Sequence, residues 1–258
     1  MPLETYVGQL EPENQDAVIW RFLNMKKFRD LMTTAELYFC RADRFADESE
    51  GLPPGNYKPF PHLNPLDLGD RRQIDDSIGN VAQWREAFYV NCWHLFREET
   101  CKMWKQYGED GLAICYTYRR LKTELDAMND RAFIGLVRYG SAHMEGWNLF
   151  RFITHKRIEY ADEQEVRAWL WIIDPHATGN RHVDGNNRIH TRPLTPPPDP
   201  VLDAHRRRVN LQMLITEVVV SPWASAQVLH DVEHLVQERG YPIPVQPSAL
   251  ARYRELLP

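Results

Sequence analysis

The residues best suited to chemistry lie in one segment of the chain, between Glu163 and Ile172. Because successive side chains of a β-strand point to opposite faces, this segment divides into an apolar face and a mixed face. The mixed face comprises Glu163, Glu165, Arg167, Trp169 and Trp171. Unpaired charge is costly in a core, and two tryptophans are unusual on a plain solvent face. Polar groups beside aromatic rings are typical of ligand pockets, so the pattern predicts the wall of a cleft. The alternative is a salt-bridged rim with its tryptophans under a helix.

Arg21 is a second candidate, because it stands between Trp20 and Phe22 in an otherwise apolar stretch. An arginine in such a place usually binds an anion. That anion is either a ligand phosphate or a carboxylate of the same chain, such as Glu50 or Glu165. We expect Arg21 and Glu165 to line the same cleft.

Other candidate ligand contacts lie on or beside the predicted strands, and they are Arg41, Asn91, Trp93, His94 and Arg167. His94 ends an apolar strand. It is interpreted either as a structural histidine whose ring nitrogens are hydrogen-bonded within the protein or as a general base.

Composition limits the classes of function. The 258 residues carry a net charge of −5, with 43% hydrophobic and 26% charged residues, which is typical of a globular domain and argues against extensive coating of nucleic acid. The four cysteines form no Cys-x-x-Cys pair, and the histidines are irregularly spaced, so we expect neither a disulfide framework nor a metal site. The N-terminus lacks the pattern of a signal peptide, and no apolar run would span a bilayer. These features predict a cytoplasmic protein without a membrane partner.

Common cofactor and nucleophile motifs are absent from the sequence. We find no Gly-x-Gly-x-x-Gly, no Walker loop, no His-Glu-x-x-His and no Gly-x-Ser-x-Gly. We therefore expect no permanently bound cofactor.

Strand-like and helix-like segments are interleaved without strict alternation, which favours a single α+β domain, residues 1–258, with a mixed or mostly antiparallel sheet and flanking helices. The predicted strands cover 18–22, 36–40, 88–94, 111–117, 134–139, 163–172 and 213–220. The predicted helices cover 25–32 after an Asn24 cap, 98–107, 119–128, 221–238 and 248–256, and the triple arginine 206–208 is also placed on a helix. Two long loops, 47–79 and 174–200, are expected to gate the cleft.

The order of several short motifs resembles the bacterial domain-of-unknown-function family numbered 2971. The motifs are Trp20-Arg21-Phe22, Leu37-Tyr38-Phe39-Cys40-Arg41, Val90-Asn91-Cys92-Trp93-His94, Met103-Trp104-Lys105-Gln106-Tyr107, His155-Lys156, Glu163-Gln164-Glu165-Val166-Arg167 and Glu217-Val218-Val219-Val220-Ser221-Pro222. The resemblance covers about residues 19–224 and leaves about 225–258 as a C-terminal helical extension. Where that family typically has Asn-Asp-Pro-Phe-Glu, this chain has Ala46-Asp47-Glu48-Ser49-Glu50. The family has no agreed activity, so the resemblance implies boundaries and candidate residues only.

A more distant resemblance is to ADP-ribosyltransferase-like folds, which place an arginine or histidine on the first strand and a glutamate late in the chain. It implies that Arg21 holds the pyrophosphate of NAD and that Glu165, with Glu163 completing a Glu-x-Glu pair, stabilises an oxocarbenium-like ribose. The Ser-Thr-Ser of such folds is absent here, and residues 91–94 stand in its place.

Three functions therefore compete. The first is an NAD- or nucleotide-using ADP-ribosyltransferase-like enzyme, such as a toxin or defence effector, with NAD as substrate. The second is a non-catalytic module that binds a nucleotide-like ligand, a peptide or a protein partner. The third is a nuclease or other hydrolase with Asp43, Asp47 and Glu50 around a metal. Contact with nucleic acid through the arginines 206–208 has weaker support than a solvated face.

Overall fold

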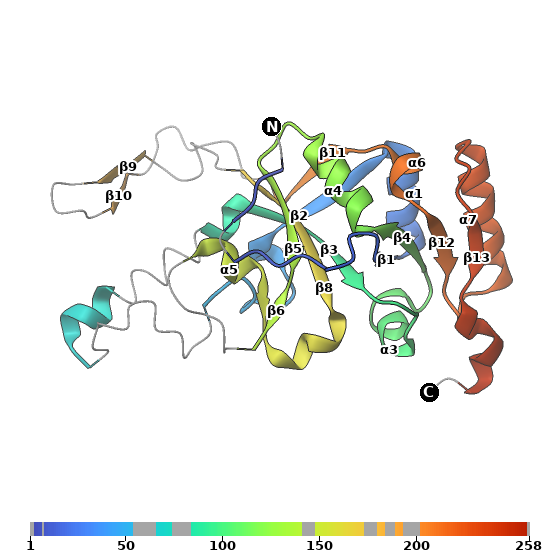
Figure 1. Cartoon of the computed structure of the whole chain (residues 1–258), viewed down its shortest axis with the longest axis horizontal. Helices are drawn as coiled ribbons and strands as arrows, with labels where there is room; N and C mark the ends of the chain where they lie inside the picture. Colours follow the sequence, from blue (N-terminus) through green and yellow to red (C-terminus); the bar gives the residue numbers. More distant parts are fainter. Residues whose placement is uncertain are drawn as a thin grey trace.

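A mostly antiparallel sheet forms the centre of the computed structural model (Figure 1). The structure describes residues 3–6, 8–53, 66–73, 84–140, 148–172, 180–183, 189–192 and 202–256. Within these residues, nine strands join in the order β11-β2-β3-β1-β4-β12-β13, with β8 beside β3 and β5 beside β8. All pairs in this sheet are antiparallel except β12 with β13. The expected α+β class with a mostly antiparallel sheet is confirmed.

The strands of this sheet are β1 (Val18–Leu23), β2 (Glu36–Arg41), β3 (Phe88–Leu95), β4 (Leu112–Thr117), β5 (Ala132–Leu136), β8 (Glu165–Trp171), β11 (Ala204–Arg208), β12 (Glu217–Val220) and β13 (Val245–Pro247). Two short pairs lie outside it, namely β6 (Arg138–Tyr139) with β7 (His155–Lys156) and β9 (Asn180–Val183) with β10 (Ile189–Arg192).

The α-helices are α1 (Met25–Thr34), α3 (Cys101–Met103), α4 (Tyr118–Asp126), α5 (Leu149–Ile153), α6 (Leu211–Leu214) and α7 (Ala226–Glu238), and residues 68–73 form a further helix. The 3-10 helices are η1 (Ala42–Arg44), η2 (Arg85–Ala87), η5 (Ile158–Glu163) and η6 (Ala249–Leu256), and η3 (Trp104–Gly108) is a π-helix. None of the helices in the described ranges is long and apolar enough to cross a bilayer.

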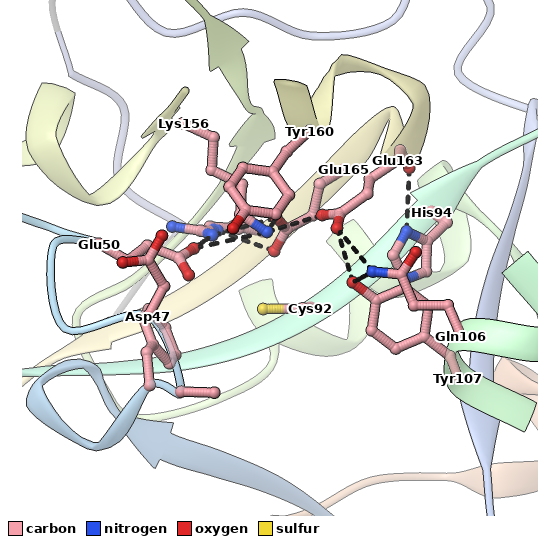
Figure 2. A pocket seen from close by; sticks show the side chains of 13 residues that line it. Asp47, Glu50, Cys92, His94, Gln106, Tyr107, Lys156, Tyr160, Glu163 and Glu165 are labelled. Carbon is pink, nitrogen blue, oxygen red and sulfur yellow. Dashed lines mark hydrogen bonds and ion pairs between the residues drawn. The ribbon is translucent and has the colours of Figure 1, made fainter. Parts of the chain in front are cut away.

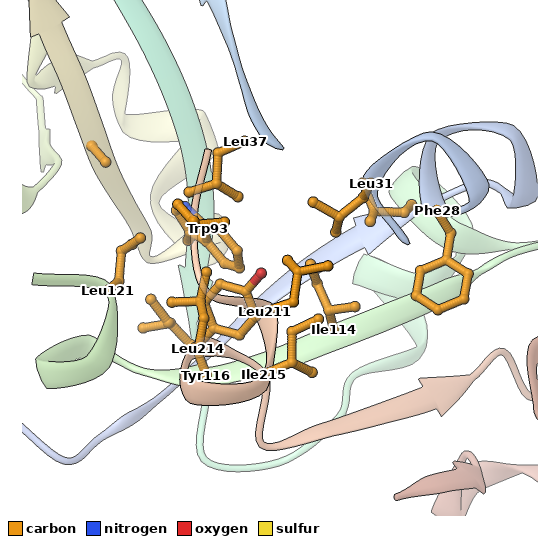
Figure 3. Packing of buried hydrophobic residues seen from close by; sticks show 14 of the residues in the cluster. Phe28, Leu31, Leu37, Trp93, Ile114, Tyr116, Leu121, Leu211, Leu214 and Ile215 are labelled. Atoms are coloured by element: carbon orange, nitrogen blue, oxygen red, sulfur yellow. The ribbon is translucent and has the colours of Figure 1, made fainter. Parts of the chain in front are cut away.

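Helices cover one face of the sheet. Phe28 and Leu31 of α1, Leu121 of α4 and Leu235 of α7 pack with the inward residues of the strands in one large apolar cluster. Figure 3 shows part of this layer, where Leu211 and Leu214 of α6 lie over Trp93 and Tyr116. We refer to this side as the helical face.

The opposite face is covered in two separate parts. At one end, Met103 and Trp104 pack against Trp20 and Cys115. At the other end, residues of α5 pack with the aromatic residues of β3, β5 and β8, which include Phe88, Phe133 and Trp169. The candidate site lies on this second face.

Local signals explain where several elements begin. The Asn24 side chain accepts a hydrogen bond from the Lys27 amide at 2.9 Å and so caps α1 as predicted. The helix α7, by contrast, begins after Ser225, whose side chain caps it, and not at Ser221-Pro222. A serine hydroxyl close to the free amides of the first turn is the stronger start signal.

Four other predictions were wrong in detail. The arginines 206–208 lie on the edge strand β11, where Arg206 and Arg207 bind Asp30 and Asp130, and not on a helix. The predicted strand 213–220 is divided into α6 and β12, with Asn210 capping α6. The predicted loop 174–200 contains the β9–β10 hairpin, and the C-terminal segment adds β13 to the sheet besides its helices.

Candidate functional site

The alternation predicted for the segment 163–172 is present in β8. In the pairing of β8 with β3, Glu165 lies opposite His94 and Arg167 opposite Cys92. Val166, Ala168 and Leu170 join the cluster on the helical face. The charged residues of β8 therefore share the opposite face with the even-numbered residues of β3.

A cavity of about 570 Å³ opens over this part of the sheet (Figure 2). Its lining residues come from the turn after η1, from β3, from η3 and from the segment 156–167, and they are Phe45, Ala46, Asp47, Glu50, Cys92, His94, Gln106, Tyr107, Lys156, Tyr160, Glu163, Glu165 and Arg167. The two tryptophans of the mixed face, Trp169 and Trp171, are not among the lining residues. Trp169 and Trp171 pack instead with the aromatic cluster around α5, as in the alternative interpretation of that face.

Lys156 lies at the centre of a cluster of carboxylates. Its ammonium is 2.6 Å from Glu163, 3.1 Å from Glu165 and 3.7 Å from Glu50, and Figure 2 shows these side chains turned toward it. Burial alone would lower the pKa of Lys156, but the carboxylates of Glu165 and Glu163 outweigh it and raise the pKa above its ordinary value. Lys156 is therefore a fixed ammonium and not a free amine nucleophile.

Arg167 holds two of the same carboxylates from the floor of the cavity. Its Nε and Nη2 donate to the two oxygens of Glu165 at 2.8 and 3.0 Å, Nη2 also contacts Glu50, and Nη1 donates to the carbonyl of Ile153. Only 1% of the Arg167 side chain is exposed. This bidentate geometry fixes Glu165 rigidly.

Glu163 reaches the cavity from the end of η5 and not from the strand. Gln164, with φ of 40°, has a left-handed conformation and separates the two elements. Such backbone is uncommon outside glycine and concentrates at functional sites. The Glu163 carboxylate accepts hydrogen bonds from Tyr107 at 2.6 Å and from Gln106 at 3.3 Å.

The π-helix η3 explains how Tyr107 reaches Glu163. The sequence predicts an α-helix in which Met103, Trp104 and Tyr107 share one buried face. In the structure Met103 and Trp104 are buried, whereas Tyr107 is 39% exposed and lines the cavity. The wider π-helical turn shifts residues 106 and 107 relative to an α-helix, and such turns occur frequently at functional sites.

His94 is a neutral group in this site. Burial lowers its pKa from 6.5 to about 4, although the Glu163 carbonyl and carboxylate oppose the shift. Its Nδ1 is 2.9 Å from the Glu163 carbonyl oxygen, which can only accept, so Nδ1 carries the hydrogen. His94 therefore helps to hold Glu163 in place and keeps Nε2 unprotonated.

The cluster carries more negative than positive charge. Among the described residues, Glu50, Glu163 and Glu165 form ion pairs with two cations, Lys156 and Arg167. A surplus charge in a buried place is costly, because low polarity strengthens the repulsion among the carboxylates. A bound proton or a cationic group of a ligand would compensate the surplus. Burial raises the pKa of Glu165, which favours the proton when no ligand is bound.

The structure thus brings together four predicted site residues, Glu163, Glu165, Arg167 and His94. The other four, Arg21, Arg41, Asn91 and Trp93, do not line the cavity.

Arg21 lies on the helical face, opposite Ile114 and over the Trp93 ring, so it and Glu165 lie on opposite faces of the sheet. The predicted cleft shared by Arg21 and Glu165 is therefore wrong. Neither expected carboxylate binds Arg21, since Glu50 and Glu165 both bind Arg167.

Asn91 and Arg41 also have other roles. The Asn91 amide donates to the Tyr38 carbonyl at 2.7 Å, and Arg41 forms an ion pair with Asp43 at 2.6 Å. Asp43 therefore pairs with Arg41 and does not line the cavity, whereas Asp47 and Glu50, its expected partners at a metal, do. In the described part of the chain, no three His, Cys, Asp or Glu residues are grouped so as to hold a metal ion.

The prediction of site residues missed Lys156, Tyr107, Gln106 and Tyr160. Lys156, Gln106 and Tyr107 do stand in motifs that carry the family resemblance. The loops expected to gate the cleft lie largely outside the described residues, although Asp47 and Glu50 at the start of the first loop line the cavity.

Comparison of the chain with family models, with curated proteins and with solved structures gave no match. The resemblances described above therefore stay predictions.

We expect stability to depend on Glu163 below neutral pH. Burial raises its pKa, but hydrogen bonds from Lys156 and Tyr107 outweigh burial and leave the pKa below the model-compound value of 4.5. The unfolded chain therefore binds the proton first as the pH falls. The stabilisation is complete above about pH 4.5 and is lost as the pH falls through the lower pKa of the folded state. In urea titrations between pH 3 and 7, Glu163→Gln should flatten this decline. An identical pH profile for both proteins would contradict the assignment.

Proposed function

We propose that the cavity is the active site of an enzyme that breaks an N-glycosidic bond in a cationic riboside, with NAD⁺ as the model substrate. The observation that supports this proposal is the surplus negative charge of Glu50, Glu163 and Glu165 around Lys156 and Arg167. A nicotinamide riboside unit is positively charged, and its ribose becomes more so as the bond breaks. The cluster offers both states an acidic environment.

Glu163 is the carboxylate that acts on the reacting ribose. Hydrogen bonds keep it ionised and oriented, and its neighbours Tyr107 and Gln106 lie on the more exposed side of the cavity. Arg167 binds both oxygens of Glu165, so Glu165, the carboxylate favoured by the sequence, acts as a positioning residue for the two cations. Fixed charge aimed at a developing cation lowers a barrier because it needs no reorganisation during the reaction.

The reaction breaks the bond between C1 of the ribose and the nicotinamide nitrogen. Both bonding electrons leave with nicotinamide, which becomes neutral. A water or acceptor hydroxyl forms the new bond to C1, and its proton passes through Glu163 to solvent. The pyrophosphate is expected outside the acidic cluster, because like charges repel at short range.

Release of nicotinamide from NAD⁺ tests this proposal. We expect Glu163→Gln to lower kcat by about 100-fold while KM changes little, since the carboxylate stabilises charge that develops in the transition state. Glu159→Gln is the matched control, because Glu159 lies on the same helix η5 but is exposed and binds Arg157. Equal rates for Glu163→Gln and wild type would reject Glu163 as the acting group. No release from NAD⁺ or nicotinamide riboside would reject the enzyme.

A binding site without turnover is the second candidate. It is favoured by the contacts of Glu165, because both of its oxygens already bind Arg167 and Lys156 when no ligand is present. Such a site would take the amine, guanidinium or pyridinium group of a small ligand or a peptide. Calorimetric binding of nicotinamide riboside without nicotinamide release would decide for this function.

A further inference from the structure

The strand β3 has two different neighbours along one edge. There β2 pairs with it at Tyr89 and Val90, and β1 pairs with it at His94 and Leu95. Between these pairs, residues 91–93 are matched with β8 on the other edge and, within the described residues, with no strand on this edge. We call this interruption between β1 and β2 the sheet notch. It is bordered on the helical face by Arg21, Asn91 and Trp93.

Arg21 has no charged partner in the described part of the chain. Its guanidinium donates one long hydrogen bond, at 3.4 Å, to the Tyr38 carbonyl, and it lies 5.3 Å from the centre of the Trp93 ring. Burial lowers the pKa of Arg21 from its ordinary value. A guanidinium that is largely shielded from water usually binds a carboxylate or another anion, because desolvation without a partner is costly.

Three buried polar atoms near Arg21 also lack hydrogen-bond partners among the described residues. They are Nε1 of Trp93, the hydroxyl of Tyr116 and Oδ1 of Asn91. The Trp93 and Tyr116 rings are 4.3 Å apart, and Figure 3 shows them side by side under α6. Asn91 and Arg21 donate to the same Tyr38 carbonyl. Groups of this kind are normally satisfied, and several together indicate a polar ligand.

The chemistry of these groups defines the ligand. Arg21, Trp93 and Tyr116 provide donors for an anion. The Asn91 amide nitrogen donates to the Tyr38 carbonyl, so Oδ1 faces the ligand as an acceptor, and the only donor that a small oxyanion can offer it is a hydroxyl. We propose that the sheet notch binds a small oxyanion that carries a hydroxyl group, namely hydrogen phosphate. Arg21 is partly exposed and Tyr38 is exposed, which gives the anion access from the side of β2.

This site is independent of the acidic cavity. The two lie on opposite faces of the sheet and have opposite charge. Loss of the phosphate site should therefore leave nicotinamide release unchanged.

Calorimetric titration with inorganic phosphate at low ionic strength tests the site. We expect wild type to bind phosphate and to bind sulfate about tenfold more weakly, because sulfate has no hydroxyl for Asn91. Tyr116→Phe should weaken phosphate binding about tenfold, and Arg21→Gln should abolish it. Arg119→Gln, which removes a surface arginine paired with Asp16, should bind phosphate as wild type does.

Thermal unfolding of Tyr116→Phe is a second test of the site, and it can be made even if Arg21→Gln does not fold. Without phosphate, this variant should melt at or above the temperature of wild type, because it removes a hydroxyl that has no partner. A lower melting temperature would show that the hydroxyl is bonded within the protein and would overturn the proposal. Phosphate affinity that is the same in wild type and Tyr116→Phe would also overturn it.

Discussion

Replacing Arg167 by methionine is expected to lower the free energy of unfolding by about 3–5 kcal/mol. The guanidinium is almost fully buried and binds Glu165 and Glu50 together. Among the described residues, its removal leaves Lys156 as the one cation paired with the carboxylates of Glu50, Glu163 and Glu165. Breaking a buried ion pair on one side is costly because the remaining charge stays desolvated.

Urea denaturation at pH 7 measures this effect. Arg157→Met is the control, because Arg157 is exposed and binds Asp47 and Glu159 at the surface, and its denaturation midpoint should equal that of wild type. The deficit of Arg167→Met should shrink at acidic pH, where the carboxylates become neutral. A deficit that stays constant from pH 7 to pH 4 would show that lost packing, and not charge, is responsible.

Replacing Trp104 by alanine is expected to cost a similar amount, about 3–5 kcal/mol. Its indole is fully buried, packs edge-on against Phe22 with ring centres 4.9 Å apart, and donates to Glu99 at 2.9 Å. The loss combines a cavity with a missing hydrogen bond, while the Ser248 hydroxyl still donates to the same Glu99 oxygen.

Trp104→Phe separates these contributions, because it keeps most of the ring volume and removes the donor. Its unfolding midpoint should lie between those of wild type and Trp104→Ala. If Trp104→Ala unfolded at the same urea concentration as wild type, the burial of this side chain would be contradicted.

The acidic wall of the cavity could be predicted from the sequence because it depends on one local rule. Alternation along β8 places Glu165 and Arg167 on one face whatever the rest of the fold does. The same rule places Arg21 on the same face of its strand as Ile19 and Leu23. It cannot decide whether this face of β1 lies on the helical face of the sheet or on the face that carries the cavity. The order and direction of the neighbouring strands decide it, and those depend on contacts far apart in the sequence.

Other residues were missed because their elements leave no periodic signal. Lys156 belongs to a strand of two residues, and Tyr107 belongs to a π-helical turn. The arginines 206–208 are predicted on a helix, whereas they lie on a strand that is defined by pairing with β2 and by ion pairs with Asp30 and Asp130. Tertiary context overrides such weak local preferences.

The π-helical turn also affects how the segment 104–108 responds to the deletion of one residue. A π-helical turn holds one residue more than an α-helical turn, so a deletion of one residue there could be absorbed by returning to α-helical geometry. Each residue of an α-helix is rotated by about 100° from the last, so Tyr107 would then turn away from Glu163 while Trp104 stayed in the core. The number of residues in this one turn, and not only the identity of its side chains, therefore determines whether Tyr107 lines the cavity and reaches Glu163.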